Sequence, residues 1–293
     1  MDGVIKKIRL SVVLILIATT VFCVGCDTFY FSEIYDDYLL RIHFIDVGQG
    51  DSIFIELPDS TTMLIDAGEK HSGDTVAEYV LSQGYNKIDY LVATHPHTDH
   101  IGGMAKIIEN FEIGKIYMPD VDTDTRTYEN LLETIADNNL KIKTARAGNY
   151  IIDSTDFKAK ILAPVTIDED NLNNCSIVIR LEYDDTSFLF TGDAELESFE
   201  AITGEIYADV LKVGHHGSVT STDEELLSKI NPYVAVISCG ENNDYGHPHK
   251  EVMEYLEACE ADIYRTDEDG TVTVFSDGKN IVVETETERG SFF

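Results

Sequence analysis

The stretch HPHTDH, residues 95–100, constrains the fold of this chain more than any other part of it. It follows the apolar run DYLVA at residues 89–93, so we expect it to begin where a buried strand ends. His95 and His97 are two positions apart, and at an extended strand end their side chains project to one side. Asp99 and His100 come next, in a turn from which a helix starting at residue 101 or 102 directs them to a second point nearby. Imidazole and carboxylate groups are ligands that Zn2+, Mn2+ and iron accept, so the stretch predicts a site for one or two divalent metal ions.

Short apolar runs bounded by turn residues recur along the rest of the chain and are typical of β-strands. They read RIHFIDV, SIFIEL, TMLIDA, DYLVAT, KIYMP, FKAKILA, SIVIRLEY, SFLFTG, DVLKVG, VAVISC and TVTVFS. Helical patterns lie between them, at residues 74–83, 102–110, 127–138, 195–201, 222–230 and 249–258. Because helices recur between strands in each half of the chain, we predict an α/β fold of two sheets covered by outer helices, which gives four layers.

The charge of the chain limits the partners that it can bind. The formal net charge is −33 over 293 residues, which repels polyanions within about a Debye length. This argues against a surface that coats nucleic acid broadly. It does not exclude a metal site that grips one phosphate, because a bound divalent cation reverses the local field.

The first 26 residues differ from the rest and predict an export signal. Three basic residues precede the uncharged apolar run at residues 10–24, which is short for a membrane span, and Gly25-Cys26 follow it. This junction resembles the lipobox of bacterial lipoproteins, although Cys23 stands where that family usually has leucine. We therefore expect residues 1–26 to be a signal peptide or membrane anchor, with the folded body outside the cytoplasm, membrane-anchored through lipid or secreted. An uncleaved anchor and a buried first helix of a cytoplasmic protein are the alternatives.

Several stretches together resemble one family. HPHTDH fits the H-x-H-x-D-H signature of the metallo-β-lactamase fold, and the chain is similar to the hydrolase domain of ComEC-type competence proteins, which serve DNA uptake. The matching stretches, in family order between residues 41 and 278, are HFIDVGQGDSIFIE, LIDAG, YLVATHPHTDHIGG, FLFTGDAE, DVLKVGHHGSVTS and VISCGENNDYGHPHKEV. The resemblance implies a four-layer αββα sandwich, with a metallo-β-lactamase-like hydrolase domain at residues 40–285. The membrane-channel portion of a competence protein has no match, so we expect a free-standing hydrolase module.

The resemblance also implies a set of metal ligands. His95 and His97 would bind one metal ion, Asp99 and His100 the other, and Asp193 of the TGD stretch would bridge them. Asp193 suits this role physically as well, because it follows the apolar run SFLF and a carboxylate at that depth needs a compensating partner.

The stretch HHGS, residues 215–218, offers two candidates for the last ligand. In an extended chain neighbouring side chains face opposite sides, so only one of His215 and His216 would face the metal ions readily. We favour His216 as the ligand, since a ligand directly before Gly-Ser is similar to related sites, and His215 would then lie near the substrate phosphate. The reverse assignment stays open.

One histidine of the usual pattern is missing. Many members of the fold add a third histidine to the first metal from the segment before TGD, and this segment reads NLNNCSIVI. Asn173 or Asn174 would face that metal instead, weakly or through water, as in the ComEC-like branch. A site poorer in nitrogen ligands brings Mn2+ beside Zn2+ as the expected ion.

Further residues are candidates for catalysis and substrate binding. His247 in GHPH is a candidate general acid or transition-state donor, and Asp99 can share general-base work with its role as a ligand. Asp51 in GQGDS can orient a ligand or contact substrate, and Asp66 in LIDAG can support a metal-binding histidine. We also assign substrate contact to Asn174 and to Ser218, whose turn can donate hydrogen bonds to an anionic oxygen.

These residues predict a metal-dependent hydrolase. The leading hypothesis is a phosphodiesterase or nuclease that acts outside the cytoplasm on DNA, including single-stranded DNA, or on another phosphodiester. The first alternative is a carboxyl-ester, thioester or lactam hydrolase of the same fold, which the missing histidine and the HHGS turn disfavour. The second is a non-enzymatic lipoprotein that binds DNA or a protein partner, and it predicts lost metal ligands, whereas the candidate ligands are all present.

Overall fold

A computed structural model of the protein describes residues 39–287. The predicted signal peptide or anchor at residues 1–26 lies outside the described residues. Within residues 39–287, no helix has the length and apolar character needed to cross a membrane.

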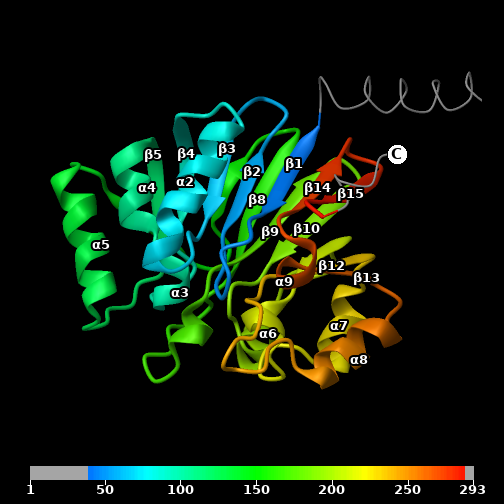
Figure 1. Ribbon diagram of the computed structural model, residues 1–293. Coiled ribbons are helices and arrows are strands. Elements are labelled where there is room, and N and C mark those ends of the chain that lie inside the picture. Colours follow the sequence, from blue (N-terminus) through cyan, green and yellow to red (C-terminus); the bar gives the residue numbers. More distant parts are fainter. Residues whose placement is uncertain (1–38, 288–293) are drawn as a thin grey trace, which may run out of the picture. The chain divides into compact units, whose positions relative to one another are not determined.

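The strands of the described part of the chain form two sheets (Figure 1). The first sheet has eight strands among residues 39–287, in the order β15 (Ile281–Thr285), β14 (Val272–Ser276), β1 (Leu40–Phe44), β2 (Ile53–Glu56), β3 (Thr62–Ile65), β4 (Lys87–Val92), β5 (Glu112–Met118) and β6 (Ile142–Thr144). The second sheet has seven within the same residues, in the order β13 (Asp262–Arg265), β12 (Val234–Ile237), β11 (Val210–Lys212), β10 (Thr186–Phe190), β9 (Val178–Tyr183), β8 (Phe157–Ala163) and β7 (Tyr150–Asp153).

Helices cover the outer face of each sheet (Figure 1). The first sheet carries α2 (Gly73–Ser82), α4 (Met104–Asn110) and α5 (Arg126–Asp137), and the second carries α6 (Leu196–Ala201), α7 (Glu224–Ile230) and α8 (Lys250–Ala258). Shorter helical turns are η1 (Lys70–Ser72), α3 (Thr98–Ile101), η2 (Leu172–Cys175), η3 (Gly214–Gly217) and α9 (Thr266–Asp269). Side-chain caps fix where two of these helices begin: the Thr125 side chain accepts a hydrogen bond from Tyr128 N before α5, and the Asp223 side chain accepts one from Leu226 N at 2.7 Å before α7.

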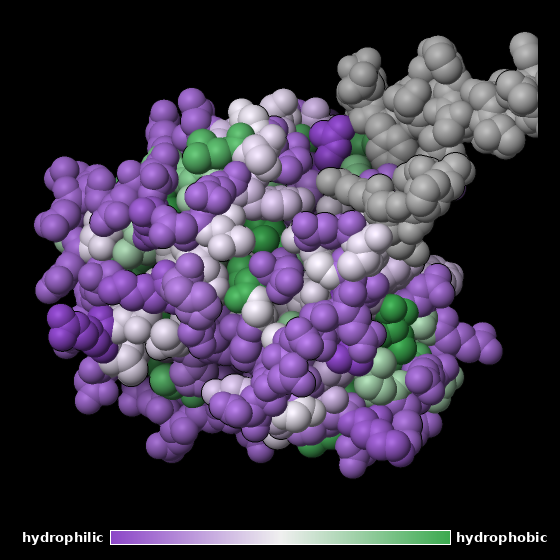
Figure 2. All heavy atoms as spheres, viewed as in Figure 1, coloured by the Kyte–Doolittle hydropathy of each residue, from purple (hydrophilic) through white to green (hydrophobic). Residues whose placement is uncertain are grey.

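Three apolar layers hold the four structural layers together. Along β10, Phe188 and Phe190 point into the core between the sheets, whereas Leu189 packs under the outer helices. This alternation is the two-residue period of a strand buried on both faces. The predicted two-sheet α/β sandwich is therefore confirmed. The face shown in Figure 2 is largely hydrophilic, with apolar residues scattered among polar ones.

The parallel part of each sheet positions the loops that carry polar residues. β3, β4, β5 and β6 run parallel in the first sheet, and β10, β11, β12 and β13 run parallel in the second. In open sheets of this kind, ligands bind beyond the carboxyl ends of the strands. HPHTDH follows β4, Asp193 follows β10, HHGS follows β11 and the loop with His247 follows β12.

Candidate active site

The end of β4 and the start of α3 place the HPHTDH residues. His97 is the residue that precedes α3, with an extended backbone (φ −73°, ψ 150°), and Asp99 and His100 lie in the first turn of this helix. The prediction that the helix begins at residue 101 or 102 was therefore wrong, since α3 begins at Thr98. From these helical positions, Asp99 contacts His216 and His100 contacts Asp193, two residues that follow strands of the second sheet.

Asp66, just after β3, orients the buried histidines of the first sheet. His100 Nδ1 donates to Asp66 Oδ2 at 2.8 Å, so His100 Nε2 is left to face the site. Thr94 Oγ1 also donates to Asp66 Oδ2, at 2.6 Å, and lies 3.1 Å from His95 Nδ1. Because Thr94 Oγ1 donates its proton to Asp66, the same oxygen can accept a hydrogen bond from His95 Nδ1–H. In this tautomer His95 Nε2 carries no proton. Burial lowers the pKa of His95 well below its usual value, in keeping with a neutral ring.

Asp193 lies among four imidazole rings and is 1% exposed. Its Oδ1 is 3.2 Å from His100 Nε2, and its Oδ2 is 3.6 Å from His216 Nε2, 3.7 Å from His215 Nε2 and 3.8 Å from His95 Nε2. Burial favours the neutral acid, but His100 and His216 outweigh it and hold the pKa of Asp193 well below its usual value. The carboxylate is therefore ionised and shared by histidines from both sheets.

The HHGS turn has a backbone that the sequence argument did not foresee. His215 (φ 47°, ψ 49°) and His216 (φ 54°, ψ 24°) are both left-handed, and Gly217 follows with φ 87°. The assumption of an extended pair was wrong, and both rings border the same cavity. His216 Nδ1 donates to the Ser238 carbonyl at 2.9 Å, which directs His216 Nε2 toward Asp99 Oδ2 at 3.2 Å.

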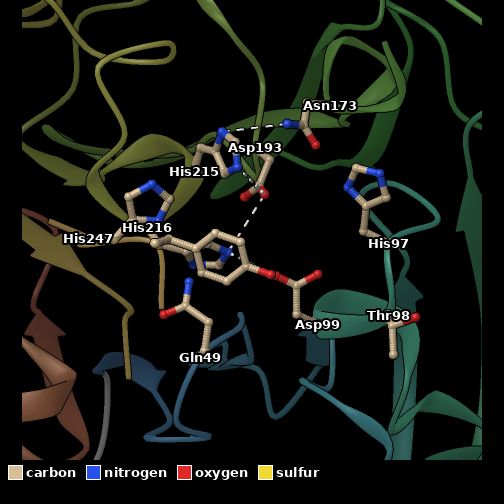
Figure 3. A pocket seen from close by; sticks show the side chains of 10 residues that line it. Gln49, His97, Thr98, Asp99, Asn173, Asp193, His215, His216 and His247 are labelled. Carbon is tan, nitrogen blue, oxygen red and sulfur yellow. Dashed lines mark hydrogen bonds and ion pairs between the residues drawn. The ribbon is translucent and has the colours of Figure 1, made fainter. Parts of the chain in front are cut away.

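A cavity of about 310 Å³ opens over these groups (Figure 3). In the view of Figure 3, His97 and Thr98 lie on one side of Asp193, and His215 and His247 lie on the other. The residues that line the cavity are Gln49, His97, Thr98, Asp99, Asn173, Asp193, His215, His216, Tyr245 and His247. Burial lowers the pKa of His247 to about 4, so this ring faces the cavity uncharged at neutral pH.

The structure brings most, but not all, of the predicted site residues to this cavity. His95 and His100 are fully buried below it, beside Asp193. Asn173 borders the cavity, whereas Asn174 turns away, with its Nδ2 donating to Asp168 Oδ2 at 3.2 Å. Ser218 does not line the cavity, and its backbone N–H donates to the His215 carbonyl at 2.9 Å to close the turn. His97, Asp99, Asp193, His215, His216 and His247 all border the cavity.

Asp51 lies beneath the cavity and pairs with a residue that sequence reasoning missed. Lys212, the last residue of β11, is fully buried, and its Nζ is 2.7 Å from Asp51 Oδ2. Burial acts to raise the pKa of Asp51, but Lys212 and His216 overcome it and lower the value to about 2. Asp51 Oδ1 lies 3.4 Å from His216 Nδ1, so the pair supports that ring from below. The available signal was the lysine inside the apolar run DVLKVG.

The donor set fits a divalent metal ion. Asp99, His100, Asp193 and His216 each offer one ligand atom, and these atoms lie within 4.8 Å of one another. Within residues 39–287, the buried atoms His100 Nε2 and Asp193 Oδ1 face each other as an ion pair at 3.2 Å but make no hydrogen bond. Burial opposes charge on His100, but Asp193, Asp66 and Asp99 raise its pKa well above its usual value, because the three carboxylates stabilise positive charge at this position. A second metal ion would have its candidate ligands at His95, whose Nε2 lies 2.9 Å from His97 Nδ1 and 3.8 Å from Asp193 Oδ2.

Comparison with known proteins identifies the family. The Metallo-beta-lactamase superfamily matches residues 45–241. The chain belongs to this superfamily. Superfamily membership and the ligand cluster imply a metal-dependent hydrolase.

Two curated relatives cover most of this chain. The ComE operon protein 3 of Bacillus subtilis is 32% identical over 252 residues, which cover 79% of this chain and 32% of the relative. Recombination protein 2 of Haemophilus influenzae is 33% identical over 244 residues, covering 80% of this chain and 28% of the relative. Competence protein ComA of Neisseria gonorrhoeae is 28% identical over 232 residues, covering 78% of this chain and 31% of the relative, and the resemblance to competence proteins is thus confirmed. The chain spans about a third of the length of these relatives.

A solved structure supports the fold alone. The metallo-beta-lactamase fold protein YhfI from Bacillus subtilis superposes with a TM-score of 0.50 at 13% identity, covering 78% of this chain and 96% of that chain. The superfamily match and this similarity agree with the two sheets and their outer helices.

Proposed function

We propose that this metal-dependent hydrolase is a phosphodiesterase that cleaves single-stranded DNA or another phosphodiester outside the cytoplasm. The observation that carries the proposal is the position of Asp193, which both sheets' histidines share at the floor of an open cavity. A carboxylate shared in this way suits a site for two cations. Two cations suit phosphodiester hydrolysis, because negative charge on both the attacking and the leaving oxygen must be neutralised. The names of two relatives, Recombination protein 2 and Competence protein ComA, favour a DNA substrate.

The chain's own residues have distinct parts in this proposal. Divalent ions, Zn2+ or Mn2+, would be held by His95, His97, Asp99, His100, Asp193 and His216. When bound there, they would lower the pKa of water and stabilise charge on phosphoryl oxygens. Asp99, which borders the cavity, accepts a hydrogen bond from the attacking water and takes up its proton. His215 and His247 line the other side and donate N–H bonds to the phosphate and to the leaving oxygen.

Export and anchoring belong to the same proposal. Lipid attachment at Cys26, expected from residues 1–26, would hold the hydrolase domain at the membrane, where incoming single-stranded DNA would meet it.

The test compares Asp193 with an exposed aspartate. The full chain, loaded with Mn2+ or Zn2+, is assayed on single-stranded DNA and bis-aryl phosphates, with nitrocefin-type lactams and thioesters as the alternative substrates. We expect phosphodiester cleavage that falls by about three orders of magnitude in Asp193→Asn, because the shared carboxylate is lost. Asp156→Asn, an exposed aspartate outside the cavity, is the matched control and should retain activity. A metal-loaded wild-type chain that cleaves no phosphodiester contradicts the proposal.

A further inference from the structure

Tyr245 combines exposure with a place at the active site. Among the exposed large apolar side chains of residues 39–287, it is the most exposed, at 68%, and it is the one that lines the cavity. An aromatic ring that is exposed where it lines a cavity offers an open surface on which a flat group of a ligand can stack.

The Tyr245 ring stacks against another ring of the cavity, which links it to the proposed metal site. It stacks on His247, with centroids 5.6 Å apart and planes at 20°. His247 in turn lies 5.4 Å from the ring of His215, whose Nε2 is 3.7 Å from Asp193. A row of rings therefore runs from the proposed metal site to Tyr245 at the cavity.

The loop that carries Tyr245 is held by one side chain. Asn243 Oδ1 accepts from Tyr245 N at 3.2 Å and from His247 N at 3.0 Å, while Asn243 Nδ2 donates to the Gly240 carbonyl at 3.0 Å. The ring is thus presented from a fixed backbone, which reduces the entropy lost when a flat group stacks on it.

The charge of the molecule decides which part of a nucleic acid this cavity can grip. The chain carries a formal net charge of −33, and the ten residues that line the cavity include no lysine or arginine. A track of backbone phosphates therefore has no lysine or arginine side chain to follow among the residues that line the cavity. Stacking of a base on an aromatic ring needs no charge and tolerates any base.

We propose that Tyr245 is a stacking platform for the nucleobase next to the scissile phosphate of single-stranded nucleic acid. This inference rests on the proposed phosphodiesterase function and adds its specificity: a diester that carries a base is preferred to one that does not. The platform acts on binding, so it changes KM and leaves kcat nearly unaltered.

The experiment uses two single-stranded oligomers of equal length and charge, oligo-dT and an oligomer of abasic sites, with the full metal-loaded chain. We expect Tyr245→Ala to raise KM for oligo-dT by about tenfold and to leave KM for the abasic oligomer unchanged. Tyr245→Phe keeps the ring and should behave as wild type. Tyr233→Ala removes a tyrosine that is 64% exposed but outside the cavity, and it should have no effect on either substrate.

Equilibrium binding gives a second measurement that does not depend on turnover. Fluorescence anisotropy of labelled oligo-dT should show the same loss of affinity in Tyr245→Ala, with no change for the labelled abasic oligomer. If wild type cleaves and binds both oligomers equally, or if Tyr245→Ala matches wild type on oligo-dT, the platform is excluded and the phosphodiesterase stands. If metal-loaded wild type cleaves neither oligomer nor bis-aryl phosphates, both proposals fall.

Discussion

The two sheets build their halves of the site in different ways. The first sheet delivers His97 on the short connection between β4 and α3, and Asp99 and His100 on α3 itself, and a carboxylate, Asp66, fixes the His100 ring. The second sheet delivers His215 and His216 on a left-handed turn, and a backbone carbonyl, that of Ser238, fixes the His216 ring. The first half follows from regular structure, whereas the second depends on strained backbone and on contacts with distant segments.

A buried ion pair joins the two halves. Lys212 comes from the second sheet, and Asp51 comes from the loop between β1 and β2 in the first. Asp51 also lies 3.4 Å from His216 Nδ1 and 3.9 Å from His100 Nδ1, so it touches a histidine of each half. If the Asp51–Lys212 pair holds the two halves in one arrangement, the stability of the protein should depend on it. Removing the pair tests this.

The largest expected effect on stability comes from Lys212→Met. It leaves Asp51 buried without its cation, and we expect the free energy of unfolding to fall by about 4 kcal/mol, as for other broken buried pairs. Urea denaturation measures this loss. The double variant Lys212→Met/Asp51→Asn removes both charges and should recover most of it.

Lys229→Met provides the control for Lys212→Met. Lys229 pairs with Glu225 at 2.8 Å on the surface of α7, where both side chains are exposed, so its loss should leave unfolding unchanged. A Lys212→Met variant as stable as wild type would show that the buried pair does not hold the halves together.

The fold was largely predictable because most of its strands and helices have a recognisable apolar pattern in their own sequence. The predicted helices at residues 74–83 and 127–138 agree with α2 and α5 to within one residue. The edge strands were missed for a physical reason: β6 is exposed at every residue, so it carries no apolar pattern. Its pairing with β5, and not its own sequence, makes it a strand.

The site was predictable in its residue types and less so in its arrangement. The pattern in HPHTDH selected residues that the structure does bring beside Asp193, because strand and helix geometry are regular. It could not choose between Asn173 and Asn174, since that depends on how η2 is turned, and it missed Lys212, whose partner is far away in sequence. The left-handed His215 and His216 had no signal, because this conformation usually belongs to glycine.

The next largest effect tests the left-handed turn itself. A Cβ at Gly217 would lie 2.6 Å from Pro248 Cβ, and the residue has φ 87°, so Gly217→Ala adds overpacking to backbone strain. We expect a loss of about 3 kcal/mol in the free energy of unfolding. Gly246→Ala is the matched control: φ is 72° but nothing lies within 4 Å, so strain alone costs about 1 kcal/mol. Equal losses for the two variants would mean that contact with Pro248 does not hold the turn.

The smallest effect separates the two ways of fixing a histidine. Asp66→Asn weakens the acceptor behind His100 Nδ1, and we expect metal affinity, measured by competition with a chromophoric chelator, to fall about tenfold. Ser238→Ala changes a side chain but keeps the carbonyl that accepts from His216 Nδ1, so metal affinity should be unchanged. The Ser238 hydroxyl oxygen is buried and has no hydrogen-bond partner, so Ser238→Ala removes no hydrogen bond. If Ser238→Ala weakens metal binding as much as Asp66→Asn, the second half relies on side chains as the first does, and the contrast between the sheets is not real.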